Sequence, residues 1–407
     1  MKRVLIVSYF FPPVSNMGSH RILRFVRHLR EFGWEPVVLT ADFKGWTQVD
    51  PRLTERVPAD VEVHRVGHVD LTGLWQKLRG GTGPGGAAPV RAHGLTTFLN
   101  RWVMVPDKFF PWIGPASRLA SALKFDAIYS TSDPVSGHLV ARRLRKPWVA
   151  EFRDLWLGSP YFARAHPTPV HRALHARLER KVVERASVVV GLSRGITDYF
   201  AKTYARPVHT VYNCFDPAEY PPPAPAGHEF TVMYAGALYS SRSPEPFLAG
   251  FAPFAKQHPE TRFVILGGSN DLDLPAMVAR LGLIGQVELP GRVAHEEALR
   301  RMQSATVLLA VQSPEDDVHV PGKLFEYLGA RRPILAVSRP CETTELITRH
   351  QLGWVAEPEP AAVLARLTEA YRLWQTNTLP AAAAERFSVR ETTRQLAAVL
   401  DEVAAAH

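Results

Sequence analysis

One stretch of the sequence, residues 313–333, combines residue types that could hold a diphosphate and a ribose. A polar loop there leads into a helix expected to open at Pro321-Gly322, with Lys323 and Glu326 in its first turn. A helix N-terminus offers unpaired backbone N–H groups and the positive end of the dipole, which suit a diphosphate. Lys323 would add a positive charge, and Glu326 could accept hydrogen bonds from a ribose diol. The pattern is also compatible with ordinary αβ architecture, in which a first-turn Glu only complements the helix dipole.

The same stretch resembles the sugar-nucleotide loop of the retaining GT-B glycosyltransferases of family 4. In that family a ribose-binding Glu falls where Glu326 stands, and a small-x-x-Pro return follows, as it does here before Pro333. The resemblance implies donor contacts from Gly322, Lys323, Leu324 and Glu326. It also implies an α/β protein of the GT-B class, with two Rossmann-like parallel-sheet domains facing across a cleft.

Further positions match the family's donor loops. The first loop of the chain carries a lone Gly18 where glycines facing the donor phosphates are usual, and it leaves room for a close backbone approach. A second loop opens with Gly236, and Arg242 matches one of two basic residues that the family supplies to the diphosphate. Arg292 and Val293 stand where the family's backbone grips the nucleobase.

Two positions depart from the family pattern. Val318 stands eight residues before Glu326, where the family has an acid near the sugar, and this puts recognition of the sugar hydroxyls in doubt more than nucleotide binding. Ala237 stands where an Arg is expected, so one phosphate contact is either missing or supplied from elsewhere.

Charged residues also follow strands of the first half. Arg153 and Asp154 come directly after an apolar strand at 148–152, at the edge of a sheet where open α/β folds bind ligands. They are candidate catalytic residues, or a structural ion pair or helix cap. Arg21, one turn into the first helix, could reach a phosphate or lie on a solvated face, whereas His138 is expected to be a packed histidine.

Apolar runs typical of strands alternate with helical patterns along the chain. They predict the strands and helices that carry the candidate site residues. The first domain is expected at 1–217, with a low-complexity and aromatic-rich insertion at 69–115. A Pro-rich linker at 218–227 and a second domain at 228–385 follow. A C-terminal helix at 386–407 is expected to pack back on the first domain, with Phe387 to Val403 as its contacts.

Helix and cysteine patterns give two smaller predictions. In the long helix expected at 170–186, Leu174, Leu178 and Val182 form the predicted apolar stripe. Cys214 and Cys341 are the two cysteines of the chain, too few for a disulfide framework, and Cys214 is expected to be structural.

Composition limits the partners. The chain of 407 residues is 46% hydrophobic and 21% charged, with a formal net charge of +9, which suits two globular domains that meet anionic partners. No nucleic-acid-binding motif is recognisable, which favours a sugar nucleotide and an anionic membrane surface over DNA or RNA. The segment after residue 90, with Arg101 and Lys108, could lie in a bilayer interface or pack on the first domain. A cytoplasmic protein, peripheral on the inner face of the membrane at most, is expected.

The predicted reaction moves a sugar from a UDP-, GDP- or dTDP-linked donor to a hydroxyl of a saccharide, lipid-linked or small-molecule acceptor, as in polysaccharide biosynthesis. Lys323, Arg242 and the helix N-terminus would stabilise the departing diphosphate. The family implies retention, with the departing phosphate taking the acceptor's proton, and neither a cofactor nor a metal is expected. A catalytically weak sugar-nucleotide-binding protein, a GT-B sugar-nucleotide epimerase and a nucleic-acid binder are the alternatives.

Overall fold

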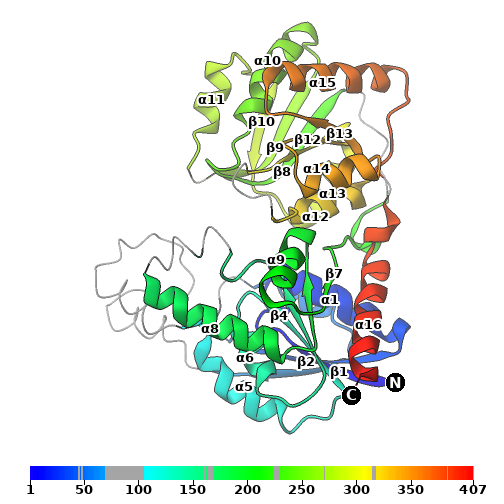
Figure 1. Ribbon diagram of the computed structural model, residues 1–407. Helices are drawn as coiled ribbons and strands as arrows, with labels where there is room; N and C mark the ends of the chain where they lie inside the picture. The colour runs from blue at the N-terminus through cyan, green and yellow to red at the C-terminus, as the bar shows by residue number, and fades with distance from the viewer. Residues whose placement is uncertain are drawn as a thin grey trace, which may run out of the picture. The chain divides into compact units, whose positions relative to one another are not determined.

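The computed structural model divides the chain into two compact units, which Figure 1 traces from the blue N-terminus to the red C-terminus. Unit 1 comprises Met1–Tyr212 and Thr392–His407, and unit 2 comprises Asn213–Glu391. The structure describes residues 1–44, 46, 49–68, 105–158, 162, 168–222, 229–269, 271–313, 318–382 and 384–406. Most of the expected insertion and the second half of the expected linker lie outside the described residues.

Unit 1 is built on a parallel seven-stranded sheet in the order β3-β2-β1-β4-β5-β6-β7. Apolar runs form its central strands because both faces of a parallel sheet are covered by helices. The strands are β1 (Lys2–Val7), β2 (Trp34–Ala41), β3 (Glu62–Val66), β4 (Ala127–Ser132), β5 (Trp148–Phe152), β6 (Val188–Gly191) and β7 (Val208–Thr210).

Helices cover this sheet and join its strands. They are α1 (Met17–His28), α2 (Pro51–Glu55), α5 (Ile113–Ala120), α6 (Ser136–Arg142), α8 (Pro169–Arg185), α9 (Arg194–Tyr204) and α16 (Val389–Ala405), with 3-10 turns η1 (Leu29–Phe32) and η2 (Phe110–Trp112). The described end of the aromatic-rich segment packs on unit 1, since Trp112 is fully buried and the ring of Phe109 lies 4.2 Å from that of Tyr9.

The apolar stripe predicted for the long helix α8 is wrong at Leu174, which is 42% exposed, whereas Val182 is buried as predicted. The other residues that α8 buries are His171, His175, Glu179 and Val183. The Glu179 carboxylate accepts hydrogen bonds from the hydroxyls of Tyr199 and Tyr204, at 3.0 and 2.6 Å. Partners on α9 therefore allow a polar face to be buried where an apolar one was expected.

The C-terminal helix α16, drawn in red in Figure 1, lies in unit 1 from Thr392 onward. Leu396, Leu400 and Val403 join the hydrophobic core that includes Val4 and Ile6 of β1. Phe387, expected to belong to this packing segment, lies in unit 2, where its ring contacts that of Phe325.

Unit 2 repeats the α/β plan with a parallel six-stranded sheet in the order β10-β9-β8-β11-β12-β13. Its strands are β8 (Thr231–Leu238), β9 (Arg262–Ser269), β10 (Val287–Gly291), β11 (Val307–Val311), β12 (Ile334–Val337) and β13 (Gly353–Ala356). Its helices are α10 (Glu245–Gln257), α11 (Leu274–Arg280), α12 (His295–Ser304), α13 (Gly322–Ala330), α14 (Glu342–Arg349) and α15 (Pro360–Gln375), with 3-10 turns η3 (Pro217–Glu219) and η4 (Glu385–Phe387).

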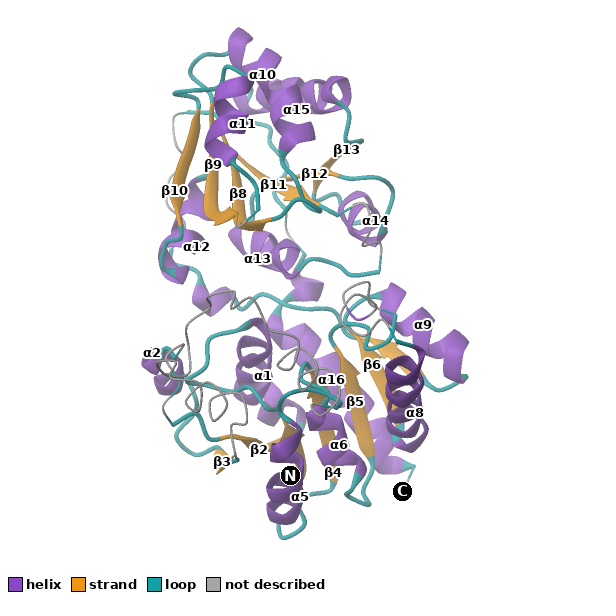
Figure 2. Ribbon diagram, turned by 90° about the vertical axis from the view of Figure 1, so that its left-hand side faces the viewer, coloured by secondary structure: helices purple, strands orange, loops and turns teal. Residues whose placement is uncertain are grey.

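In both views α10 and α15 lie on one side of this sheet and α12 and α13 on the other (Figure 1 and Figure 2). The core between the sheet and the first group is rich in phenylalanine, including Phe230, Phe247, Phe251 and Phe254. This packing fixes the strand ends, and with them the loops that carry the candidate site.

Candidate functional site

The strand order of unit 2 points to one edge of its sheet. From β8 the chain continues to β9 and β10 on one side of the sheet. It then crosses to β11, which lies on the other side of β8. In open α/β sheets a ligand crevice lies at such a reversal, outside the carboxyl ends of the two strands. The loop after β8 carries Arg242, and the loop after β11 leads into α13. Two of the stretches singled out in the sequence therefore meet at the switch point of this sheet.

Helix α13 begins at Gly322, within the Pro321-Gly322 pair at which the sequence predicts its opening. Its N-cap residue is Pro321, which makes no side-chain cap hydrogen bond to the first-turn N–H groups. The Lys323 ammonium lies 2.6 Å from a carboxylate oxygen of Glu326, and the two side chains are 38% and 13% exposed. An accessible cation and a largely buried carboxylate thus share the first turn of one helix.

Gly236, expected to open a loop, lies instead near the end of strand β8 and against Lys323. Gly236 has φ +145, and a Cβ on it would lie 3.4 Å from the hydroxyl of Tyr234 and 3.6 Å from Cε of Lys323. Glycine is favoured here because other side chains rarely adopt this backbone conformation. The structure therefore brings Gly236 and Lys323 together, as the sequence predicts for two parts of one site.

Arg242 faces the same group of residues. Burial raises the pKa of the Tyr234 phenol, and the Arg242 guanidinium opposes that rise, which places the two side chains within electrostatic reach. Nε of Arg242 is buried and finds no hydrogen-bond partner among the described residues. Arg242 therefore brings a cation with an unsatisfied donor to the neighbourhood of Gly236.

Two tyrosines support the site, and the sequence analysis missed both. The Tyr327 hydroxyl accepts a hydrogen bond from the backbone N–H of Ala235 at 3.0 Å, and the Tyr234 hydroxyl donates one to the carbonyl of Ala237 at 3.0 Å. Tyr327 is 1% exposed, so it fixes α13 to the end of β8 from within the core. The only sequence signal for it is an aromatic residue next to Glu326.

The other predicted donor residues lie further along the unit. Arg292 and Val293 follow β10, an outer strand that β9 separates from β8. Arg292 is exposed and Val293 is partly buried. Leu324 is buried in the core, so only its backbone is available to a ligand. Val318 is partly buried just before α13, and Asp316 and Asp317 lie outside the described residues.

Unit 1 has its own switch point, between β1 and β4. Arg153, just after β5, donates from Nε to the carbonyl of Ser132 and from Nη2 to the carbonyl of Asp133 at 2.6 Å. A Cβ on Gly18 would lie 2.6 Å from Nη1 of Arg153. The space beside Gly18, expected to admit a phosphate, is therefore filled by this guanidinium. Asp154 is exposed beside it.

Both interpretations of Arg21 from the sequence are wrong. Arg21 neither lies on a solvated face nor is free to reach a phosphate, because it is 1% exposed and its Nη2 lies 2.6 Å from a carboxylate oxygen of Glu151. Its remaining donors bind the carbonyls of Val211 and Tyr212 at 2.9 and 2.8 Å. Arg21 is thus a structural residue that joins α1, β5 and the segment after β7.

His138 and Cys214 are buried, as predicted for packed residues. Nδ1 of His138 lies 2.8 Å from the Ser130 hydroxyl, and burial lowers the pKa of His138 to about 3, with Arg153 adding to the effect. His138 is therefore a neutral core residue.

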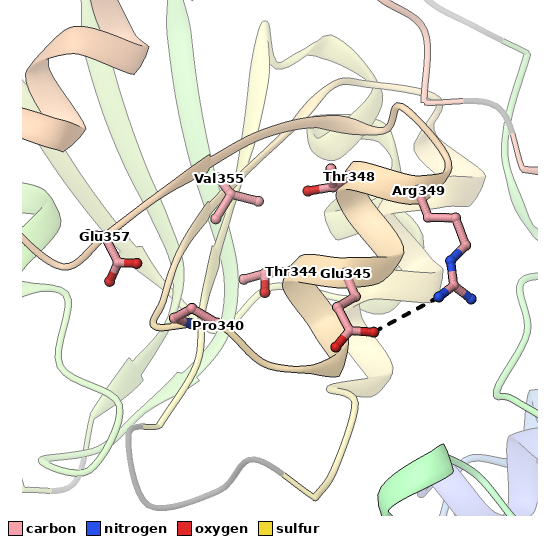
Figure 3. A pocket seen from close by; sticks show the side chains of 7 residues that line it. All are labelled: Pro340, Thr344, Glu345, Thr348, Arg349, Val355 and Glu357. Atoms are coloured by element: carbon pink, nitrogen blue, oxygen red, sulfur yellow. Dashed lines mark ion pairs between the residues drawn. The ribbon is translucent and has the colours of Figure 1, made fainter.

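A hollow of about 470 Å³ runs along α14, and none of the predicted donor residues lines it (Figure 3). Thr344, Glu345, Thr348 and Arg349 of the helix line it together with Pro340, Val355 and Glu357. Glu345 and Arg349 lie 4.0 Å apart as an exposed pair. The described part of the chain shows no group of three or more His, Cys, Asp or Glu able to hold a metal, and no helix there is long and apolar enough to cross a membrane.

Two family models match the chain, one in each half. Residues 18–214 match the model described as a glycosyl transferase 4-like domain, and residues 229–372 match the model described as glycosyl transferases group 1. No curated protein matches the chain at the level of sequence.

Solved structures are similar over nearly the whole length. Anabaena HepE, solved with UDP and glucose, has a TM-score of 0.67 at 16% identity, with 99% of this chain and 100% of that chain covered. Sucrose-phosphate synthase from Thermosynechococcus elongatus has a TM-score of 0.60 at 13% identity, with 100% of this chain and 97% of that chain covered. A UDP-N-acetylglucosamine 2-epimerase has a TM-score of 0.59 at 10% identity, again covering 100% and 97%. At these identities the similarity is one of fold.

Proposed function

The chain is a glycosyltransferase with the GT-B fold, and on this premise we propose that it moves a glycosyl group from a nucleoside-diphosphate sugar to a hydroxyl, with retention at the anomeric carbon. The observation that carries the proposal is the convergence of Gly236, Lys323 and Glu326 at the switch point of the unit 2 sheet. A diphosphate needs cations and backbone N–H groups, and a ribose needs a hydrogen-bond acceptor. This group of residues offers both.

The difficult step is departure of the diphosphate, whose negative charge grows as the glycosidic bond breaks. In the proposal Lys323, Arg242 and the N-terminal N–H groups of α13, from Gly322 to Leu324, stabilise that charge. Glu326 holds the ribose diol, and the backbone at Arg292 and Val293 holds the base. The leaving phosphate takes the proton of the acceptor hydroxyl, and the positive groups of the protein make a metal unnecessary.

The acceptor is proposed to be a saccharide, a lipid-linked saccharide or a small molecule. Arg153 and Asp154, at the corresponding edge of the unit 1 sheet, are proposed to serve it. The net charge of +9 supports a peripheral contact with an anionic membrane surface, where lipid-linked acceptors are found. The complex of HepE with UDP and glucose makes a uridine nucleotide the first donor to test.

The test is a thermal-shift screen with UDP-, GDP- and dTDP-linked sugars, followed by transfer assays with saccharide and lipid-linked acceptors in buffer with and without EDTA. A specific donor stabilises the protein in proportion to its affinity and concentration. We expect one nucleotide class to stabilise, and product to form equally with EDTA. Stabilisation without transfer would favour a binding protein, and solvent deuterium entering the sugar without any acceptor would favour an epimerase.

A further inference from the structure

The switch point of the unit 1 sheet carries a donor and an acceptor that the described structure leaves unused. The first turn of α1 contributes Gly18, the last residue of β4 is Ser132, and Asp133 follows it directly. Parallel strand ends on either side of a reversal in strand order form the crevice in which open α/β sheets bind ligands. The strand order thus selects this edge without reference to the donor site.

Arg153 is held at this edge by its backbone contacts. Its Nε and Nη2 donate to the carbonyls of Ser132 and Asp133, which fixes the plane of the guanidinium. Nη1, on the side of Gly18, has no hydrogen-bond partner among the described residues. A guanidinium held by two of its nitrogens therefore presents the third as a donor.

Asp133 presents the matching acceptor. Asp133 is accessible to solvent although protein atoms crowd its carboxyl group, and no described residue donates a hydrogen bond to that carboxylate. Desolvation by the protein around it raises the pKa of Asp133 to about 6, the Asp154 carboxylate adds to the rise, and Arg153 opposes it. Asp107 is the other carboxylate that acts on it, and Asp107 is occupied by the N–H and hydroxyl of Ser136, at 2.9 and 2.7 Å.

The local charge selects the kind of ligand. Three carboxylates and one guanidinium act at this edge, so a phosphorylated group would be repelled. A hydroxyl, in contrast, both donates and accepts a hydrogen bond. A ligand with neighbouring hydroxyls and no charge can therefore use both Asp133 and Nη1 of Arg153.

We propose that Asp133 and Arg153 bind hydroxyls of a neutral saccharide, and that this is where the acceptor sugar of the transfer reaction is held. The role of this site as the acceptor site rests on the proposed function, whereas saccharide binding rests on the residues of unit 1 alone. Asp133 accepts a hydrogen bond from one hydroxyl, and Arg153 donates one to the same or the neighbouring oxygen.

The experiment measures binding of methyl glycosides and of the matching monosaccharide 6-phosphates by saturation-transfer NMR, on the full chain. The variants are Asp133→Asn, which keeps the shape, Asp133→Ala, and Asp198→Asn as a control on an exposed aspartate of α9. Stabilisation by UDP, measured in parallel, reports folding and the donor site. We expect at least one neutral glycoside to bind, about tenfold weaker binding in both Asp133 variants, and no change in the control.

The two proposals fail separately in this design. Glycoside binding that survives both Asp133 substitutions, tighter binding of the 6-phosphates, or no binding of any neutral glycoside overturns the saccharide site. A wild-type protein that ignores every nucleotide but still binds glycosides through Asp133 overturns the donor assignment and leaves the saccharide site standing. Loss of UDP stabilisation in Lys323→Ala, with glycoside binding kept, supports both.

Discussion

The ammonium of Lys323 and the carboxylate of Glu326 form an ion pair of 2.6 Å within the first turn of α13. The two side chains were assigned to different parts of a nucleotide, the diphosphate and the ribose, and their contact holds both at one helix end. The Glu326 side chain is 13% exposed, so its neighbours restrict its conformation more than they would restrict a side chain on the surface. The pair therefore connects the two halves of the proposed donor site.

Lys323→Ala and Glu326→Ala should each lower glycosyl transfer by about 10²-fold or more, the usual scale for loss of one charge-stabilising group. Lys323→Ala removes a cation from the leaving diphosphate, and Glu326→Ala removes the acceptor for the ribose. The measurement is kcat/KM for the donor identified by the thermal-shift screen. Lys256→Ala, on the exposed side of α10, is the control and should retain full activity. Wild-type rates in both site variants would remove the donor assignment.

Tyr327→Phe should destabilise unit 2 by about 1–3 kcal/mol, because the buried N–H of Ala235 loses the hydroxyl that accepts its hydrogen bond and cannot reach water. Urea unfolding followed by tryptophan fluorescence gives the free energy of unfolding. Tyr239→Phe, at a tyrosine that is 43% exposed, is the control and should change stability by less than about 0.5 kcal/mol. Equal stabilities of the two variants would show that the hydroxyl of Tyr327 does not support strand β8.

The elements of the fold are readable from the sequence where apolar runs are short and continuous. Strand β5 has the bounds 148–152 that its apolar run predicts, because a buried parallel strand needs apolar residues on both faces. Helix α13 was likewise predicted from its Gly-Lys opening and apolar face. These features are local, so the sequence contains all that is needed to predict them.

Partners distant in sequence account for what the sequence analysis missed. Arg21 and Glu151 are 130 positions apart, and nothing near Arg21 indicates that a buried carboxylate will meet it. The buried polar face of α8 likewise depends on tyrosines of α9. Asp133 was overlooked because its setting, beside Arg153 and Asp154, arises only when the ends of β4 and β5 become neighbours.

The buried pair of Arg21 and Glu151 predicts a strong and non-additive effect on the stability of unit 1. Arg21→Met leaves the Glu151 carboxylate buried without its cation, which should cost about 3–5 kcal/mol of unfolding free energy. The double variant Arg21→Met/Glu151→Met should recover much of that loss, since no charge remains buried. Urea unfolding checks both values, with the exposed pair Asp198 and Lys202 as a control of about 0–1 kcal/mol. A double variant that loses the sum of the two single effects would contradict this account.

The lowered pKa of His138 predicts that the free energy of unfolding decreases as the pH is lowered. Its pKa is lowered to about 3 in the folded protein by burial, and Arg153 opposes protonation further. The unfolded chain binds this proton near pH 6.5, so the stability that neutral His138 contributes is present above that pH and is lost as the pH falls toward 3. From pH 7 to pH 5 the loss due to this residue should be about 2 kcal/mol. His138→Gln has no such proton, so urea unfolding at the two pH values should show a smaller decrease for the variant by that amount. Parallel decreases in wild type and variant would mean that His138 takes up its proton in the folded state as well.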